Sequence, residues 1–123
     1  MYLDHANIVT SDLDAAVDFF TEVLGLTAGP RPNFRVPGYW LYSDSRPLIH
    51  LTQATTGVHA GKSSTRIDHI ALRVAAPPEW SALLARLKYY QIDYQLGARA
   101  DDRDTQLWVA LTPNVTIEFI MAH

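Results

Sequence analysis

The chain has 123 residues, 48 % hydrophobic and 19 % charged, as expected for one small globular domain. Ten basic and thirteen acidic residues give a net charge of −3 without a basic stripe, which argues against nucleic acid as a partner. The absence of cysteine excludes disulfides and thiolate ligands, so His, Asp and Glu remain as strong metal ligands. No basic leader and no apolar run of membrane-spanning length is present, so we expect no membrane partner and a cytoplasmic location.

The first half of the chain predicts a strand, a helix and then further strands. Residues 2–9 alternate as in a strand, and Ser11 with Asp14 resembles a capping box that begins a helix. Apolar residues at helical spacing continue to Gly25, a natural stop. The proline-rich segment 27–39 predicts irregular structure with a short edge strand at most. Two strands that flank the turn "DSRP" complete this half, at 39–43 and 47–53.

The second half repeats this order after a polar, aperiodic stretch. We interpret that stretch, 54–66, as a linker inside a single domain, 1–123. Module one is then 1–53, and module two is 67–123. The second module predicts a strand, a helix that begins at a proline pair, a short strand, a polar loop and a closing hairpin. Their residues are 66–74, 77–91, 92–96, 97–104 and 105–121.

Matching residues in the two halves indicate a duplication. "LDHANIV" at 3–9 returns as "IDHIALRV" at 67–74, which places His69 64 positions after His5. In the hairpins, Glu118 follows His50 by 68 positions, and Trp108 follows Trp40 by the same number. A true repeat should align at more than one place. The sequence therefore predicts an α+β fold made of two tandem βαβββ modules.

Strand alternation predicts that several polar side chains lie on the sheet face that no helix covers. Four of them can bind a metal: His5, His50, His69 and Glu118. Three histidines and a carboxylate suit one divalent ion such as Zn, Ni, Fe(II), Mn or Co, but not Ca or Mg. Asn7 and Arg73 share this face and are candidate substrate contacts.

Simpler explanations exist for each of these residues taken alone. One strand histidine is more often a packing or surface residue than a ligand, and Arg73 could be an ordinary surface arginine as well as a carboxylate anchor. Trp40 and Trp108 suit packing better than the wall of a cleft. His59 in the linker and His123 at the last position do not match the repeat and are expected to be bystanders.

The segments "LDHANIV", "PLIHL", "IDHIALRV" and "VTIEF" together resemble the vicinal oxygen chelate superfamily. That superfamily includes glyoxalase I, methylmalonyl-CoA epimerase, extradiol dioxygenases, and the fosfomycin and bleomycin resistance proteins. The resemblance implies a metal centre in a cup-shaped cleft and commonly a homodimer. It also implies that His5, His69 and Glu118 match the two-His, one-Glu triad of extradiol dioxygenases. His50 departs from the Glu or Gln that glyoxalase I and the epimerase usually have as a further ligand.

Three functions remain open at this point. The leading hypothesis is a lyase or isomerase that binds a small-molecule substrate through adjacent oxygens, with His50 and Glu118 as catalytic groups and His50 as ligand or base. It is preferred because four candidate ligands are present. The first alternative is an Fe(II) extradiol-type ring-cleaving dioxygenase, which needs open positions for substrate and O₂. The second is a metal-free binding protein of the bleomycin-resistance kind.

Overall fold

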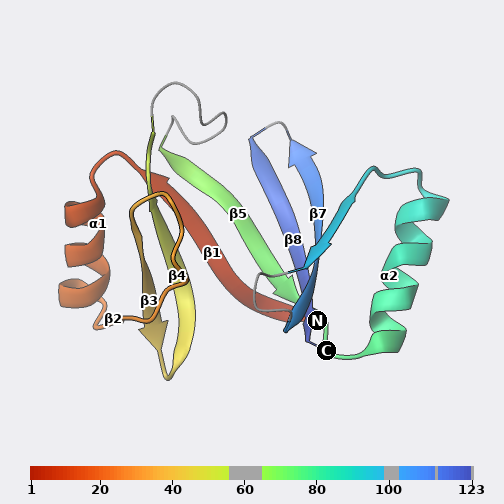
Figure 1. The fold of residues 1–123 in the computed structure, drawn as a ribbon, viewed down its shortest axis with the longest axis horizontal. Helices are drawn as coiled ribbons and strands as arrows, with labels where there is room; N and C mark the ends of the chain where they lie inside the picture. Colours follow the sequence, from red (N-terminus) through yellow and green to blue (C-terminus); the bar gives the residue numbers. More distant parts are fainter. Residues whose placement is uncertain (56–64, 99–102, 113, 123) are drawn as a thin grey trace. The chain divides into compact units, whose positions relative to one another are not determined.

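The computed structural model describes residues 1–55, 65–98, 103–112 and 114–122 (Figure 1). Over these residues the fold is α+β, with eight strands, two α-helices and one π-helical turn. In chain order they are β1 (Tyr2–Thr10), α1 (Leu13–Asp18), η1 (Phe19–Val23), β2 (Thr27–Gly29), β3 (Gly38–Ser43), β4 (Arg46–Gln53), β5 (Arg66–Arg73), α2 (Pro77–Tyr89), β6 (Gln95–Ala98), β7 (Asp104–Thr112) and β8 (Val115–Ala122).

Contacts divide the chain into two compact units. The N-terminal unit is His5–Asp68. The C-terminal unit is His69–His123 together with Met1–Asp4. Each boundary therefore falls inside a strand, between the Asp and the His of a repeated "DH" pair.

In the N-terminal unit, the strand order is β2-β3-β4-β1. β1 and β4 are parallel, and the other neighbours are antiparallel. The parallel pair requires a crossover, which α1 and the hairpin strands provide. β2 confirms the predicted short edge strand, and β3 with β4 confirms the predicted hairpin. Leu41 and Leu51 are fully buried in this unit.

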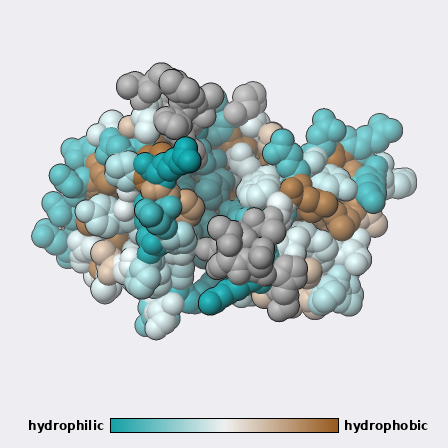
Figure 2. All heavy atoms as spheres, viewed as in Figure 1, coloured by the Kyte–Doolittle hydropathy of each residue, from teal (hydrophilic) through white to brown (hydrophobic). Residues whose placement is uncertain are grey.

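The first helix differs from its prediction at its start. Asp12, not Ser11, is the N-cap, and its side chain accepts a hydrogen bond from the Ala15 backbone N–H at 3.1 Å. A carboxylate satisfies a free N–H group and also interacts favourably with the positive end of the helix. After six residues α1 widens into η1, and Gly25 follows with φ +75°, the left-handed conformation that ends a helix. Hydrophobic and hydrophilic atoms are interspersed on the surface near α1 (Figure 2).

The C-terminal unit has the strand order β5-β8-β7-β6, with β5 and β8 parallel and the other neighbours antiparallel. Helix α2 begins at the predicted proline pair and lies beside these strands (Figure 1). Its apolar stripe and the strand residues beneath it form the core of the unit. The buried members are Val74, Trp80, Leu83, Leu87 and Leu107.

Other predictions differ in position or lie outside the described residues. The strand expected at 92–96 is observed at Gln95–Ala98. Most of the predicted linker, 56–64, and the middle of the predicted loop, 99–102, are outside the described residues, as are His59 and His123. Within the part of the chain that the structure describes, no helix combines the length and the apolar character needed to cross a bilayer.

Candidate metal centre

The strongest pair of candidate ligands lies on neighbouring strands of the C-terminal unit. His69 is on β5 and Glu118 on β8, and these strands pair in parallel through the register Ala71↔Glu118. The His69 Nε2 atom lies 3.4 Å from Glu118 Oε2. Two ligands that are each about 2.1 Å from one ion are about 3.4 Å apart at the tetrahedral angle. The two side chains are therefore spaced as ligands of one ion would be.

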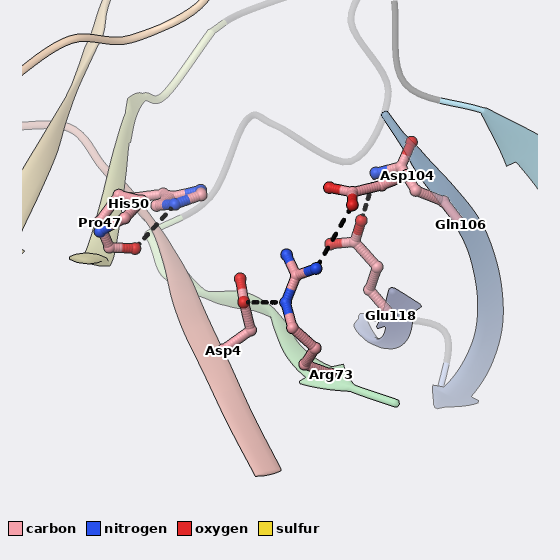
Figure 3. Close-up of polar contacts among 7 residues, drawn as sticks. All are labelled: Asp4, Pro47, His50, Arg73, Asp104, Gln106 and Glu118. Carbon is pink, nitrogen blue, oxygen red and sulfur yellow. Dashed lines mark hydrogen bonds and ion pairs between the residues drawn. The ribbon is translucent and has the colours of Figure 1, made fainter. Parts of the chain in front are cut away.

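Burial makes the Glu118 carboxylate notable. Glu118 is only 4 % exposed, and a buried carboxylate is costly unless a cation or hydrogen-bond donors compensate its charge. Gln106, on the adjacent strand β7, donates a hydrogen bond from Nε2 to Glu118 Oε1 (Figure 3). The other carboxylate oxygen, Oε2, is the one that faces His69. The donor set of an imidazole and a carboxylate suits a borderline divalent ion.

In the N-terminal unit, three aromatic rings form a stack. His50 lies between the other two: its ring centroid is 3.7 Å from that of His5 and 4.0 Å from that of Trp40. The interplanar angles are 12° and 14°, so the three rings are nearly parallel. His5 and His50 are both buried, and His50 Nε2 lies 3.1 Å from the carbonyl oxygen of Pro47 (Figure 3). Trp40 therefore packs, as predicted, but against a candidate site residue.

This stack affects the four-ligand prediction. An imidazole nitrogen binds a metal roughly in the plane of its ring, at about 2.1 Å. The rings of His5 and His50 are nearly parallel, with centroids 3.7 Å apart, so an ion in the plane of one ring lies well off the plane of the other. The stack therefore gives no support to an ion shared by His5 and His50, and their joint ligation stays a prediction.

Asn7 lies on the same face of β1 as His5, two residues further along the strand. Its Nδ2 group donates a hydrogen bond to Thr52 Oγ1 at 3.3 Å. Its Oδ1 atom is buried and has no hydrogen-bond partner among the described residues. A buried acceptor without a partner is unfavourable by about 1–3 kcal/mol. The side chain therefore has one buried acceptor that the described residues leave without a hydrogen bond.

Arg73, the other candidate substrate contact, is bound by two carboxylates of its own unit. Its Nε atom lies 2.8 Å from Asp4 Oδ1, and its Nη1 atom lies 3.3 Å from Asp104 Oδ1 (Figure 3). Burial alone would lower the pKa of Arg73. The hydrogen bonds that Arg73 makes with Asp4 and Asp104, together with the negative charges of these residues, outweigh burial and raise the pKa. A raised pKa means that the ion pairs of Arg73 stabilise the folded protein. This stabilisation is fully present at any pH below the ordinary pKa of arginine and is lost only as the pH rises through the raised pKa.

We expect the replacement Arg73→Leu to destabilise the protein because it removes the two ion pairs that the guanidinium makes with Asp4 and Asp104. The expected loss is about 1.5–3 kcal/mol in the free energy of unfolding, the range for hydrogen bonds to charged groups. Urea titration followed by circular dichroism measures it, and Lys88→Leu at an exposed position of α2 is the matched control. Equal stability of the two variants would show that the observed ion pairs do not contribute.

The second tryptophan of the repeat lines a hollow in the C-terminal unit. Trp108 lies opposite Glu118 in the β7–β8 register. The hollow has a volume of about 480 Å³ and is lined by Asp93, Tyr94, Gln95, Trp108, Ala110 and Thr116. In the β5–β8 register Thr116 is the partner of His69, so the hollow begins beside a candidate ligand. Trp108, expected to be a packing residue, thus also lines this hollow.

Comparison with protein families identifies the superfamily. Residues 2–93 match the family described as the Glyoxalase/Bleomycin resistance protein/Dioxygenase superfamily. The chain belongs to this superfamily. The resemblance found in the sequence is thereby confirmed for the glyoxalase/dioxygenase superfamily as a whole. A comparison with curated proteins found no match.

Solved structures of similar fold include glyoxalase/dioxygenase enzymes. The chain is 20 % identical to a catechol 2,3-dioxygenase, with a TM-score of 0.74. The match covers 98 % of the present chain and 41 % of the dioxygenase chain. The Mn(II)-bound glyoxalase from Novosphingobium aromaticivorans is 17 % identical with a TM-score of 0.73, and the match covers 97 % of the present chain and 37 % of the glyoxalase chain. Homoprotocatechuate 2,3-dioxygenase from Arthrobacter globiformis is 19 % identical with a TM-score of 0.72, and the match covers 99 % of the present chain and 36 % of that chain. The chain thus spans about two fifths of these proteins and shares their fold.

Two site residues were missed by sequence reasoning, Gln106 and Asp4. Gln106 precedes Trp108 by two positions on β7, so alternation alone would have placed it on the face of Glu118. Asp4 precedes the candidate ligand His5 in the first "DH" pair, and only the histidine of each pair was predicted to be a site residue. Their partners, Glu118 and Arg73, are distant in sequence, and no local pattern indicates such pairs.

Proposed function

We propose that this superfamily member is a divalent-metal-dependent enzyme that acts on a small molecule with two adjacent oxygens. His69 and Glu118 would bind the ion, and His5 would be the third ligand. The single observation that carries the proposal is the 3.4 Å spacing between His69 Nε2 and Glu118 Oε2 at a buried carboxylate. In this proposal the two βαβββ modules form the cup-shaped cleft, and a homodimer remains a further expectation.

The chemistry of these side chains fits such an ion. Two imidazoles and one carboxylate are the set that non-haem Fe(II) oxygenases use, and Mn, Co, Ni and Zn accept the same donors. When bound, the ion supplies Lewis-acid binding of the substrate's two oxygens and stabilises negative charge on them. Glu118 supplies the anionic ligand, and Gln106 holds the carboxylate oxygen that faces away from His69. The orphaned Asn7 Oδ1 would accept a hydrogen bond from a substrate hydroxyl.

The contacts of His50 bear on the choice of reaction. The preference for a lyase or isomerase depended on four ligands around one ion, and the stack of His50 on His5 does not support a shared ion. A three-ligand set leaves positions open for a bidentate substrate and O₂, as ring cleavage requires. We therefore place extradiol-type dioxygenation first and lyase or isomerase chemistry second, with His50 as the catalytic group specific to the second.

We expect protein purified without chelator to contain close to one equivalent of divalent metal per chain. Inductively coupled plasma mass spectrometry measures Fe, Mn, Zn, Ni and Co together. With the Fe(II)-loaded protein, oxygen uptake in the presence of a catechol panel supports ring cleavage. Loss of a hemithioacetal without oxygen uptake supports the lyase or isomerase reaction.

The opposite outcome would favour a metal-free binding protein of the bleomycin-resistance kind. Less than about one tenth of an equivalent of metal, and no binding when Mn(II) or Fe(II) is added in excess, would contradict the metal-dependent proposal. Both measurements are needed, because a weakly held ion can be lost during purification.

A further inference from the structure

Gln106 and Glu118 form a side-chain pair across the antiparallel strands β7 and β8. In the register Gln106 is opposite Ile120, and Glu118 is opposite Trp108, so the two polar residues are diagonal neighbours on one face. The Gln106 amide donates its hydrogen bond to Glu118 Oε1 (Figure 3). Both side chains lie on the face of these strands opposite the core of the unit, so neither packs in that core.

The hydrogen bond differentiates the two oxygens of the carboxylate. Oε1 accepts from Gln106, while Oε2 is the oxygen 3.4 Å from His69 Nε2. A carboxylate can rotate about its last bond and can bind an ion through one oxygen or through both. A donor fixed on Oε1 favours a single rotation of the carboxylate, the one in which Oε2 faces His69.

The chemical nature of the donor also matters. An amide donates without carrying a charge, whereas lysine or arginine in the same place would neutralise the carboxylate. The hydrogen bond from Gln106 thus contacts the carboxylate of Glu118 without adding a positive charge. Asp104, two residues before Gln106 on β7, forms an ion pair with the guanidinium of Arg73.

We propose that Gln106 is a positioning residue that holds Glu118 for binding of the metal through Oε2 alone. This inference rests on the proposed function, because it requires that Glu118 is a metal ligand. Hydrogen-bond partners of metal ligands typically account for about 10–100-fold in metal affinity. The role is distinct from ligation, since the amide need not touch the ion or the substrate.

The replacement Gln106→Met tests the proposal because methionine keeps the length of the side chain and removes the N–H donor. We expect the affinity for Mn(II), measured from the electron paramagnetic resonance signal of the free ion, to fall by about 10–100-fold. The thermal midpoint of the metal-free protein should fall, because the buried carboxylate of Glu118 loses a hydrogen-bond donor, so circular dichroism at the assay temperature must show a folded variant before affinities are compared. If this variant does not fold, Gln106→Leu removes the same donor and is measured in the same way.

A double-mutant comparison makes the test specific. In a Glu118→Ala background there is no carboxylate to orient, so Gln106→Met should cause no further loss of Mn(II) affinity. Unchanged affinity in the single variant, or an equal loss in both backgrounds, would overturn the positioning role. If the unsubstituted protein binds no metal, the proposed function fails, and this outcome is distinct from failure of the role of Gln106.

Discussion

Replacing Glu118 with alanine is expected to lower the affinity of the protein for Mn(II) by more than about 100-fold. This carboxylate would be the only anionic ligand of the proposed ion, and partners that merely orient ligands already account for about 10–100-fold. Fluorescent-chelator competition measures the affinity over this range. Because Glu118 is buried, circular dichroism should confirm that the variant is folded before its affinity is compared.

Two other replacements sharpen this result. Glu22→Ala removes an exposed carboxylate on η1 and should leave the affinity unchanged. His50→Ala should lower the affinity by less than Glu118→Ala does, because the variant loses a ring that stacks on His5 and not a ligand or the hydrogen-bond partner of one. Equal affinity of Glu118→Ala and Glu22→Ala would refute the ligand role of Glu118. A loss in His50→Ala as large as in Glu118→Ala would restore the four-ligand site.

Replacing Leu107 with alanine is expected to reduce the free energy of unfolding by about 2–5 kcal/mol, as for other buried leucines. Leu107 is fully buried in the core between β7 and α2. Its removal leaves a cavity where Trp80 and its neighbours pack, and the rigid strand can close that cavity only in part. Chemical denaturation with urea at neutral pH gives the change directly.

The control lies on the same strand. Leu111 in β7 is 65 % exposed, so Leu111→Ala should change stability by less than about 0.5 kcal/mol. The two variants delete the same atoms from one strand, and they differ in burial. A similar small change in both would mean that the core under α2 is not packed as observed.

The sequence was sufficient where periodicity carries the information. Alternation along β1, β5 and β8 placed His5, Asn7 and Glu118 on faces opposite those packed against helices, and all three are buried, not open to solvent. The apolar stripe of α2, with Trp80, Leu83 and Leu87, was also readable from its spacing. These features depend on neighbours within one element, which a single sequence contains.

The remaining features depend on contacts between elements. Sequence spacing predicted which face of β4 carries His50 but could not show that its ring is stacked between Trp40 and His5. In the same way, Arg73 was recognised as a candidate anchor, but its two carboxylate partners are 69 and 31 positions away. A side chain's face follows from local geometry, whereas its partner follows from packing.

The division of the chain inside each "DH" pair has a consequence for dissecting the protein. Residues 1–4 belong with the C-terminal half, and they bring Asp4 to Arg73. A fragment that begins at the second repeat would therefore lack one of the two carboxylates around that arginine. A fragment that ends at the first repeat would carry Asp4 without the arginine. The C-terminal unit is therefore not one continuous stretch of chain, because its first four residues come from the N-terminus.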